Sequence, residues 1–174
     1  MNKEAFAIWL TGLPSSGKST VCRELKWRLQ AAGINAGILE SDELRRILTP
    51  EPTYSDEERD RFYDQLADLG RILTQQGINV LIDATAHKRR YRDRARNIIP
   101  RFIEVYIECP LETCMKRDPK GIYRLALSRG STTVPGVNVP FEIPLHPDVT
   151  LDCRHNPSQS AETVVSLLRS RLYI

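Results

Sequence analysis

The fold of this 174-residue chain is decided by the stretch Gly12-Leu13-Pro14-Ser15-Ser16-Gly17-Lys18-Ser19-Thr20. Two glycines with four residues between them, followed by Lys and Ser, match the P-loop pattern. The apolar run Phe6–Leu10 precedes the loop and predicts a buried strand, and Val21, Leu25 and Leu29 follow it at helical spacing. This strand–loop–helix context is the one in which such a loop binds the phosphates of a nucleotide.

Each residue type in the loop suits a chemical task. Gly12 and Gly17 let the backbone turn so that its N–H groups point at phosphate oxygens, and the following helix adds its positive N-terminus. We expect Lys18 to contact the β- and γ-phosphates of ATP, and the Ser19 hydroxyl to bind Mg²⁺. The remaining loop residues are expected to line the same nucleotide site: Leu13, Pro14, Ser15, Ser16 and Thr20.

Length and composition indicate a single domain over residues 1–174, because 41% of the residues are hydrophobic and can form a core. The formal net charge of +3 is too small to indicate nucleic-acid binding. No apolar run is long enough to cross a membrane, and the first residues lead straight into a strand, so we expect no signal peptide and a cytoplasmic protein. The four cysteines lack metal-binding spacing, which favours free buried thiols in a reducing compartment.

Strand-like and helix-like segments alternate along the chain. The expected strands span about residues 6–11, 36–40, 78–82, 101–107 and 148–151, and the expected helices about residues 18–32, 42–48, 55–76, 88–98, 111–117, 123–128 and 161–172. The alternation predicts an α/β fold of the P-loop nucleotide-kinase type, with a five-stranded parallel sheet between two layers of helices. Residues 129–147 show little periodicity and predict a long mobile loop, within a lid at about residues 117–147.

Polar residues follow the expected strands, where ligands bind in a parallel sheet. We expect Asp42 to orient the acceptor hydroxyl and take its proton, although it could equally cap the helix that follows. Either Glu40 or Asp83 could support the magnesium ion, and the sequence leaves that choice open. His87 has no partner in the sequence, and we expect it on the surface or in a substrate loop.

Two segments concentrate basic residues. Residues 88–96 carry six positive charges in nine positions, arranged so that one face of a helix could point at the cleft while the other is solvated. A charged surface helix explains at least half of them. The segment Lys116–Lys120 precedes the long loop, so that a cation there could close over the transferring phosphoryl group and neutralise its developing charge.

Motifs along most of the chain, from Phe6 to Asp152, resemble those of the adenylyl-sulfate kinases. These P-loop enzymes phosphorylate the 3′-hydroxyl of adenosine 5′-phosphosulfate (APS) with MgATP. The similar segments are Leu39–Arg45 (family Leu-Asp-Gly-Asp-Asn-x-Arg), Tyr54–Arg59 (Phe-Ser-x-Glu-Asp-Arg), Lys116–Tyr123 (Lys-Arg-Asp-x-Lys-Gly-Leu-Tyr) and Gly136–Glu142 (Gly-Ile-x-x-Pro-Tyr-Glu).

The resemblance implies a role for each matching position. Lys18, Asp42 and Lys120 would be catalytic, and Arg117 would contact the nucleotide. The implied substrate-binding residues are Asp42, Arg45, Tyr54, Arg59, Arg89 and Val137, with Tyr54 stacking on the substrate adenine. The family also implies a place in sulfate assimilation, and many of its members form homodimers.

Several positions depart from the family pattern. An Asn and paired arginines are replaced by Phe62, Asp64 and Gln65, a Ser by Ala86, and a lid Phe by Val134-Pro135. The acceptor therefore stays open between APS and another small hydroxyl compound, such as a sugar acid, a nucleoside or an antibiotic. A third hypothesis, a nucleotide-dependent binding module with little turnover, is opposed by Asp42 and Lys120, which a binder does not need.

Overall fold

A computed structural model describes residues 4–129 and 133–174 of the chain. The strands are β1 (Ala7–Thr11), β2 (Ala36–Glu40), β3 (Asn79–Asp83), β4 (Phe102–Glu108) and β5 (Val149–Asp152). The helices are α1 (Lys18–Ala31), α2 (Ser41–Leu48), α3 (Asp56–Gln75), α4 (Arg89–Ile98), α5 (Leu111–Arg117), α6 (Ile122–Arg129) and α7 (Pro157–Ser170).

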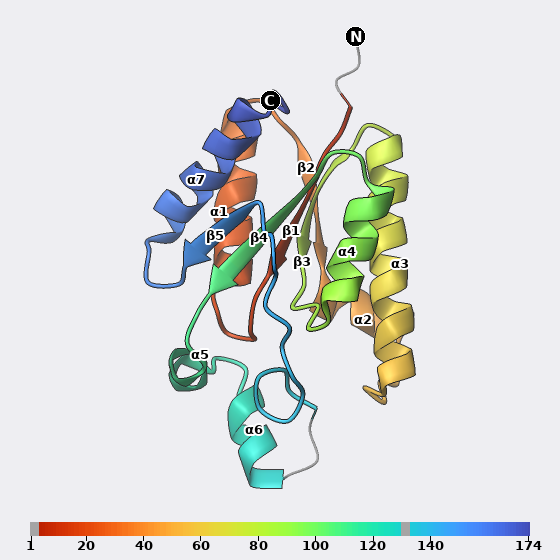
Figure 1. Ribbon diagram of the computed structural model, residues 1–174, viewed down its shortest axis with the longest axis vertical. Coiled ribbons are helices and arrows are strands. Elements are labelled where there is room, and N and C mark those ends of the chain that lie inside the picture. The colour runs from red at the N-terminus through yellow and green to blue at the C-terminus, as the bar shows by residue number, and fades with distance from the viewer. Residues whose placement is uncertain (1–3, 130–132) are drawn as a thin grey trace.

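Within these described ranges the strands form one five-stranded parallel sheet in the order β2-β3-β1-β4-β5. Helices α1 and α7 cover one face, and α3 and α4 cover the other (Figure 1). Successive side chains of β1 alternate between two cores, because neighbouring residues of a strand point to opposite faces. Ile8 and Leu10 pack on the α1–α7 side, whereas Ala7 and Trp9 pack on the α3–α4 side. The predicted three-layer fold is confirmed.

Helix ends follow local capping chemistry. Ser55 caps α3, since its hydroxyl accepts a hydrogen bond from the Glu58 N–H at 3.2 Å. Helix α7 begins at Pro157, four residues before the expected start at 161, because Pro fits the first helical turn and the Asn156 side chain accepts from the Ser158 N–H at 2.8 Å. Asp42 does not cap α2; it lies in the first turn of that helix.

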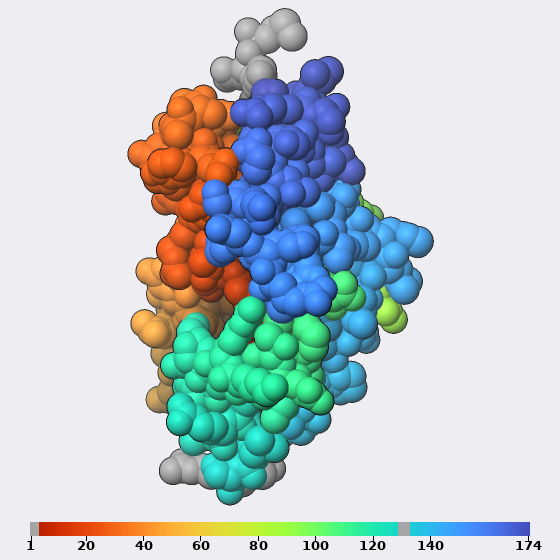
Figure 2. Space-filling model, turned by 90° about the vertical axis from the view of Figure 1, so that its left-hand side faces the viewer, coloured from red at the N-terminus to blue at the C-terminus, as the bar shows by residue number. Residues whose placement is uncertain are grey.

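The predicted lid segment, residues 117–147, begins beyond the carboxyl ends of the strands, where α5 and α6 form a lobe below the sheet (Figures 1 and 2). It then returns along the sheet to β5, and the Asp148 N–H that follows it donates to the Glu104 carbonyl of β4. It contacts the P-loop directly, since the Tyr123 hydroxyl donates to the Pro14 carbonyl at 2.8 Å. Gly136, at φ 93°, also approaches the loop so closely that a Cβ there would lie 2.7 Å from a Leu13 methyl carbon. Residues 130–132 of the expected loop lie outside the described residues.

The expectation of free thiols is wrong for two of the four cysteines. Cys109 and Cys153 form a disulfide with a Cα–Cα distance of 5.2 Å. They follow β4 and β5, whose register pairs Glu108 with Asp152, so the next two residues come together at the sheet edge. Cys22 and Cys114 are free and buried, as expected. None of the described helices is long and apolar enough to cross a membrane.

Candidate active site

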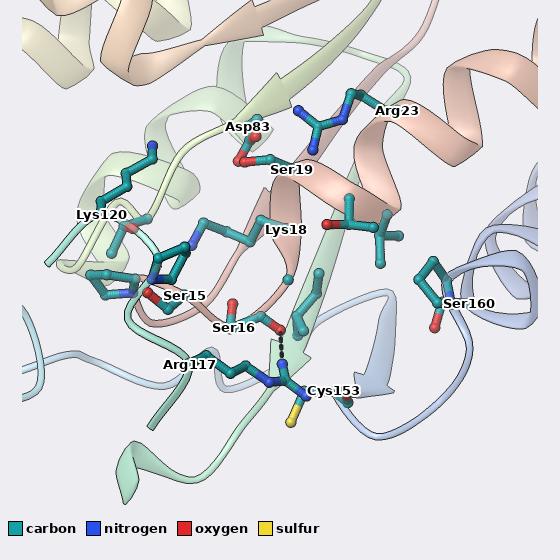
Figure 3. Close-up of a pocket in the computed structure, with 18 of the residues that line it drawn as sticks. Ser15, Ser16, Lys18, Ser19, Arg23, Asp83, Arg117, Lys120, Cys153 and Ser160 are labelled. Atoms are coloured by element: carbon teal, nitrogen blue, oxygen red, sulfur yellow. Dashed lines mark hydrogen bonds between the residues drawn. The ribbon is translucent and has the colours of Figure 1, made fainter. Parts of the chain in front are cut away.

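A cavity of about 760 Å³ opens at the carboxyl ends of the strands. Its walls come from the P-loop, the ends of β2 and β3, the turn between α5 and α6, and the segment that follows β5 (Figure 3). This is the edge at which parallel α/β sheets bind ligands. The sequence-predicted residues that line it are Pro14, Ser15, Ser16, Gly17, Lys18, Ser19, Thr20, Glu40, Asp42, Asp83, Arg117 and Lys120.

The P-loop backbone depends on its two glycines. Gly17 adopts φ 106° at the N-cap of α1, a conformation that side chains strongly disfavour. A Cβ at Gly12 would lie 2.7 Å from the Ile107 carbonyl oxygen, which is backbone and cannot move aside. The Ser16 hydroxyl is buried and has no partner among the described residues, so a polar ligand group in the loop could bind it.

Lys18 is held by carbonyl groups of its own loop. Its ammonium donates to the carbonyl oxygens of Gly12 at 3.1 Å and Leu13 at 2.8 Å. Burial lowers the pKa of Lys18, and the negative charge of Asp83 opposes that shift. A buried ammonium held only by neutral oxygens is well prepared to bind an anion.

Oxygen ligands of the kind that Mg²⁺ prefers meet at the same wall of the cavity. Ser19 lies in the first turn of α1, and Asp83 ends β3 in register with Leu10 and Glu40 of its neighbours. Asp83 is only 5% exposed. The Ser19 hydroxyl and the Asp83 carboxylate both line the cavity (Figure 3), so these residues fit a magnesium ion.

Asp42 and Lys120 form an ion pair at the mouth of the cavity. Asp42 lies in α2 and Lys120 in the turn before α6, so the pair joins the core of the protein to the predicted lid segment. The hydrogen bond with Asp42 raises the pKa of Lys120. The predicted base and the predicted lid cation are thus brought together, 78 residues apart in sequence.

Arg117 connects the P-loop with the segment after β5. Its guanidinium donates to the Ser16 carbonyl at 3.4 Å, the hydrogen bond drawn in Figure 3, and to the Cys153 carbonyl at 2.9 Å. Sequence reasoning missed that second segment. The cavity-lining residues there are Asp152, Cys153, Arg154, His155, Asn156, Pro157 and Ser160. They carry no motif, and the one available signal was their place at the carboxyl end of the fifth strand.

The predicted acceptor-binding residues Arg45, Tyr54 and Arg59 form a separate cluster beside the cavity. Arg45 pairs with Glu58, with 3.1 Å between Nη1 and Oε1. The Arg45 guanidinium carbon lies 5.3 Å from the Tyr54 ring centre, and the Arg59 carbon lies 5.6 Å from it. Arg59 also donates to the carbonyl and hydroxyl oxygens of Thr133, at 2.5 and 2.6 Å, and so binds the predicted lid segment.

Arg89 and Val137 lie outside the nucleotide cavity. Arg89 binds the predicted lid segment, donating to the Ile143 carbonyl at 3.1 Å and from its backbone N–H to Glu142 at 2.7 Å. Val137 lines a second cavity of about 540 Å³, together with the stacked rings of Tyr106 and Phe141. Neither Arg89 nor Val137 lines the cavity that the P-loop borders.

The basic residues of α4 face carboxylates rather than the cleft. Lys88 and Arg90 pair with Asp60, and Arg94 pairs with Asp64 and Asp68 of α3. Arg92 is 1% exposed and pairs with Glu104 at 2.8 Å, whereas Arg96 binds Glu104 and Asp148. The idea that one face of this helix points at the cleft is wrong for these residues.

His87 is buried, so the surface position, one of the two alternatives expected for it, is wrong. It is 1% exposed and packs edge-on against the rings of Tyr63 and Tyr91. Its ring nitrogens have no hydrogen-bond partner among the described residues. Burial and the positive charge of Arg59 lower its pKa to about 4, so the imidazole is neutral near pH 7.

Comparison with known proteins identifies the family. The adenylylsulphate kinase family model matches residues 4–152. An adenylyl-sulfate kinase of Rippkaea orientalis is 34% identical over 167 residues, 96% of this chain and 91% of the relative. A probable adenylyl-sulfate kinase of Archaeoglobus fulgidus is 36% identical over 152 residues, 87% of this chain and 98% of the relative.

A solved structure agrees with these relatives. The Mycobacterium tuberculosis APS kinase in complex with AMPPNP and APS is 32% identical to this chain and superposes with a TM-score of 0.90. The match covers 95% of this chain and 98% of that one. The chain therefore belongs to the adenylyl-sulfate kinase family of P-loop kinases.

Proposed function

We propose that this protein transfers the γ-phosphoryl group of ATP to the 3′-hydroxyl of APS, giving 3′-phosphoadenosine 5′-phosphosulfate. The observation that carries the proposal is the cavity in which the P-loop Lys18 meets the Asp42–Lys120 pair. A nucleotide-binding loop needs neither a carboxylate nor a second cation to bind ATP alone, whereas transfer to a hydroxyl uses both. Family membership and the structural relative that holds AMPPNP and APS support the choice of substrates.

The residues divide the reaction between them. Lys18 leaves the carbonyls of Gly12 and Leu13 to bind the β- and γ-phosphates, where its charge balances theirs. Asp42 orients the acceptor hydroxyl and takes its proton as the oxygen attacks. Lys120 moves from Asp42 to the transferring group and stabilises its charge.

Two further residues hold the nucleotide. Ser19, with Asp83 behind it, would bind a magnesium ion, which supplies charge neutralisation of the phosphates when bound. Arg117 would contact the nucleotide next to the P-loop, from its position between Ser16 and Cys153. Arg45, Tyr54 and Arg59, with Arg89 and Val137 as the remaining predicted contacts, would bind APS.

The test is ADP release measured with APS and with a panel of sugar acids, nucleosides and aminoglycosides. APS should raise the rate strongly above the slow hydrolysis of ATP, and the other acceptors should not. An ADP rate that APS leaves unchanged excludes the proposal, and a response to another acceptor identifies the alternative kinase. Arg59→Ala separates the cases further, because it should raise KM for an anionic acceptor and leave a neutral one unaffected.

Asp42→Asn tests the general base. Loss of the proton acceptor should lower kcat by about 10²–10⁴-fold with ATP binding retained. Glu43→Gln is the matched control, since Glu43 is the exposed neighbour on the same helix turn and does not line the cavity. An Asp42 variant that turns over at the parent rate would indicate a binding module rather than an enzyme.

We also propose the wider setting that the sequence suggests. The protein would act in sulfate assimilation, in the cytoplasm. It would consist of a single domain whose lid, residues 117–147, moves during turnover. It would form a homodimer and would bind neither nucleic acid nor membranes. The need for ATP supports the location, and the ion pairs of α4 leave few free cations for nucleic acid. In a reducing compartment the Cys109–Cys153 pair would be exposed to reduction, which thiol trapping in cells can measure.

A further inference from the structure

Helix α3 places a phenyl ring directly under a cation of α2. The guanidinium carbon of Arg45 lies 3.9 Å from the centre of the Phe62 ring. Phe62 is 0% exposed and packs edge-on against Tyr63, with 5.3 Å between ring centres, so its ring is fixed in place. Such contact between a guanidinium and an aromatic face is attractive and favours one orientation of the cation.

The other sides of Arg45 are also fixed. Glu58 binds Nη1 at 3.1 Å, and the Tyr54 ring lies 5.3 Å from the guanidinium carbon. The Glu58 carboxylate is itself held by the Thr53 and Tyr54 backbone N–H groups. The Arg45 side chain is 13% exposed, so part of it remains accessible to a ligand.

The cluster formed by Arg45, Tyr54 and Arg59 has few other cations. The paired arginines of the family pattern are replaced by Asp64 and Gln65, and Asp64 binds Arg94 on the α4 side. Within the described residues of the cluster, Arg45 and Arg59 provide the positive charge, and Arg59 is bound to Thr133. The orientation of Arg45 therefore has a large influence on how an anionic acceptor binds.

We propose that Phe62 is a positioning residue that holds the Arg45 guanidinium flat, in the orientation that meets the anionic group of the acceptor. The inference rests on the proposed function. Phe62 occupies the position at which the family pattern has an Asn. An Asn amide could hydrogen-bond a ligand directly, whereas the Phe62 ring would act through the neighbouring Arg45 guanidinium. A pre-oriented cation binds an anion more tightly, because less side-chain freedom is lost on binding.

Phe62→Leu removes the aromatic face and keeps an apolar side chain. We expect KM for APS to rise about 3- to 10-fold, while kcat and KM for ATP stay within about 2-fold of the parent. Phe62→Tyr retains the ring and should restore KM for APS. Phe6→Leu is the matched control, since Phe6 is also fully buried but packs on the opposite face of the sheet. It should lower the melting temperature without changing either KM.

Equilibrium binding of APS, measured by calorimetry, separates this inference from the proposed function. If the parent turns over APS and Phe62→Leu binds it as tightly as Phe6→Leu does, the inference is wrong and the function stands. If the parent binds APS without turnover and Phe62→Leu weakens that binding, the function is wrong and the inference stands. If APS neither binds nor turns over, both are wrong.

A spectroscopic measurement checks the geometry without activity. The Arg45 guanidinium carbon lies over the Phe62 ring, 3.9 Å from its centre, so we expect the neighbouring Nε–H proton to resonate upfield of other arginine protons. Phe62→Leu should abolish that shift and Phe62→Tyr should keep it. An unshifted Arg45 signal in the parent protein overturns the inference.

Discussion

Lys18 and Arg117 of the nucleotide cavity differ from Arg92 and Arg94 of α4 in the partners that hold them. Lys18 and Arg117 bind main-chain carbonyl oxygens, which are neutral and which a phosphate can replace. Arg92 and Arg94 bind carboxylates that already balance their charge. For these four cations, the presence of a carboxylate partner separates α4 from the cavity, whereas the local density of positive charge, which is higher in α4, does not indicate the anion site.

The largest expected effect belongs to the cavity. Lys18→Met removes the ammonium that binds the phosphates and should lower kcat/KM for ATP about 10³-fold. Stability should hold or rise, because a buried ammonium with a lowered pKa is removed. Lys88→Met, at the N-cap of α4, is the control and should leave kcat/KM unchanged. Equal losses in both variants, measured by ADP release, would break the distinction between the two groups of cations.

The next effect is on stability and belongs to α4. Arg92→Met leaves Glu104, 6% exposed at its side chain, without its closest partner and should lower the free energy of unfolding by about 3 kcal/mol. Activity per folded molecule should change little. The double variant Arg92→Met/Glu104→Gln removes both charges and should recover most of the loss. Urea unfolding measures all three proteins, and a stable single variant would contradict a structural role for this pair.

A pH titration of stability tests the same comparison at a third kind of basic residue. His87 lies beside the cations Arg59 and Lys88, and its own imidazole stays neutral near pH 7. Its folded-state pKa of about 4 is below the usual value near 6.5, so the unfolded chain binds the proton more readily. The stability that this residue contributes is present above pH 6.5 and is lost as the pH falls toward 4. We expect about 2 kcal/mol less stability at pH 5 than at pH 7 from this group.

Unfolding curves of the parent and His87→Gln at several pH values measure that contribution. The variant should show a flatter pH dependence between pH 4 and 7, whereas His146→Gln, at an exposed histidine, should match the parent. Parallel curves for the parent and His87→Gln would show that the imidazole is not held neutral.

The smallest effect is expected at the surface of α4. Arg94→Gln breaks two ion pairs with half-exposed aspartates, at 3.3 and 3.0 Å, and should cost less than about 1 kcal/mol of stability. Neither KM should change. A rise in KM for APS in this variant would mean that Arg94 contacts the acceptor, and that α4 contributes to substrate binding as the cavity does.

Local patterns predicted much of the fold. The P-loop and the alternation of strands and helices each depend on residues close in sequence, and the structure agrees with both. Asp42 and Lys120 were matched through family motifs, and their meeting at the cavity depends on the fold around them.

Contacts between distant segments were harder to predict. Nothing near His87 in the sequence indicates that Tyr63 and Tyr91 bury it, and nothing near α4 indicates the aspartates of α3. The start of α7 differs from the expected residue 161 for a local reason, since Pro157 occupies the first helical turn, where Pro is common.

The disulfide between Cys109 and Cys153 closes a covalent ring that contains α5, α6 and the whole of residues 117–147. A ring of 44 residues lowers the entropy of the unfolded chain and should contribute about 4 kcal/mol to stability when oxidised. The ring also changes what a single cut does to the molecule. A protease that cleaves once inside the ring produces two fragments that stay joined by the disulfide and separate only on reduction. The cleaved segment therefore remains attached to the protein at both of its ends.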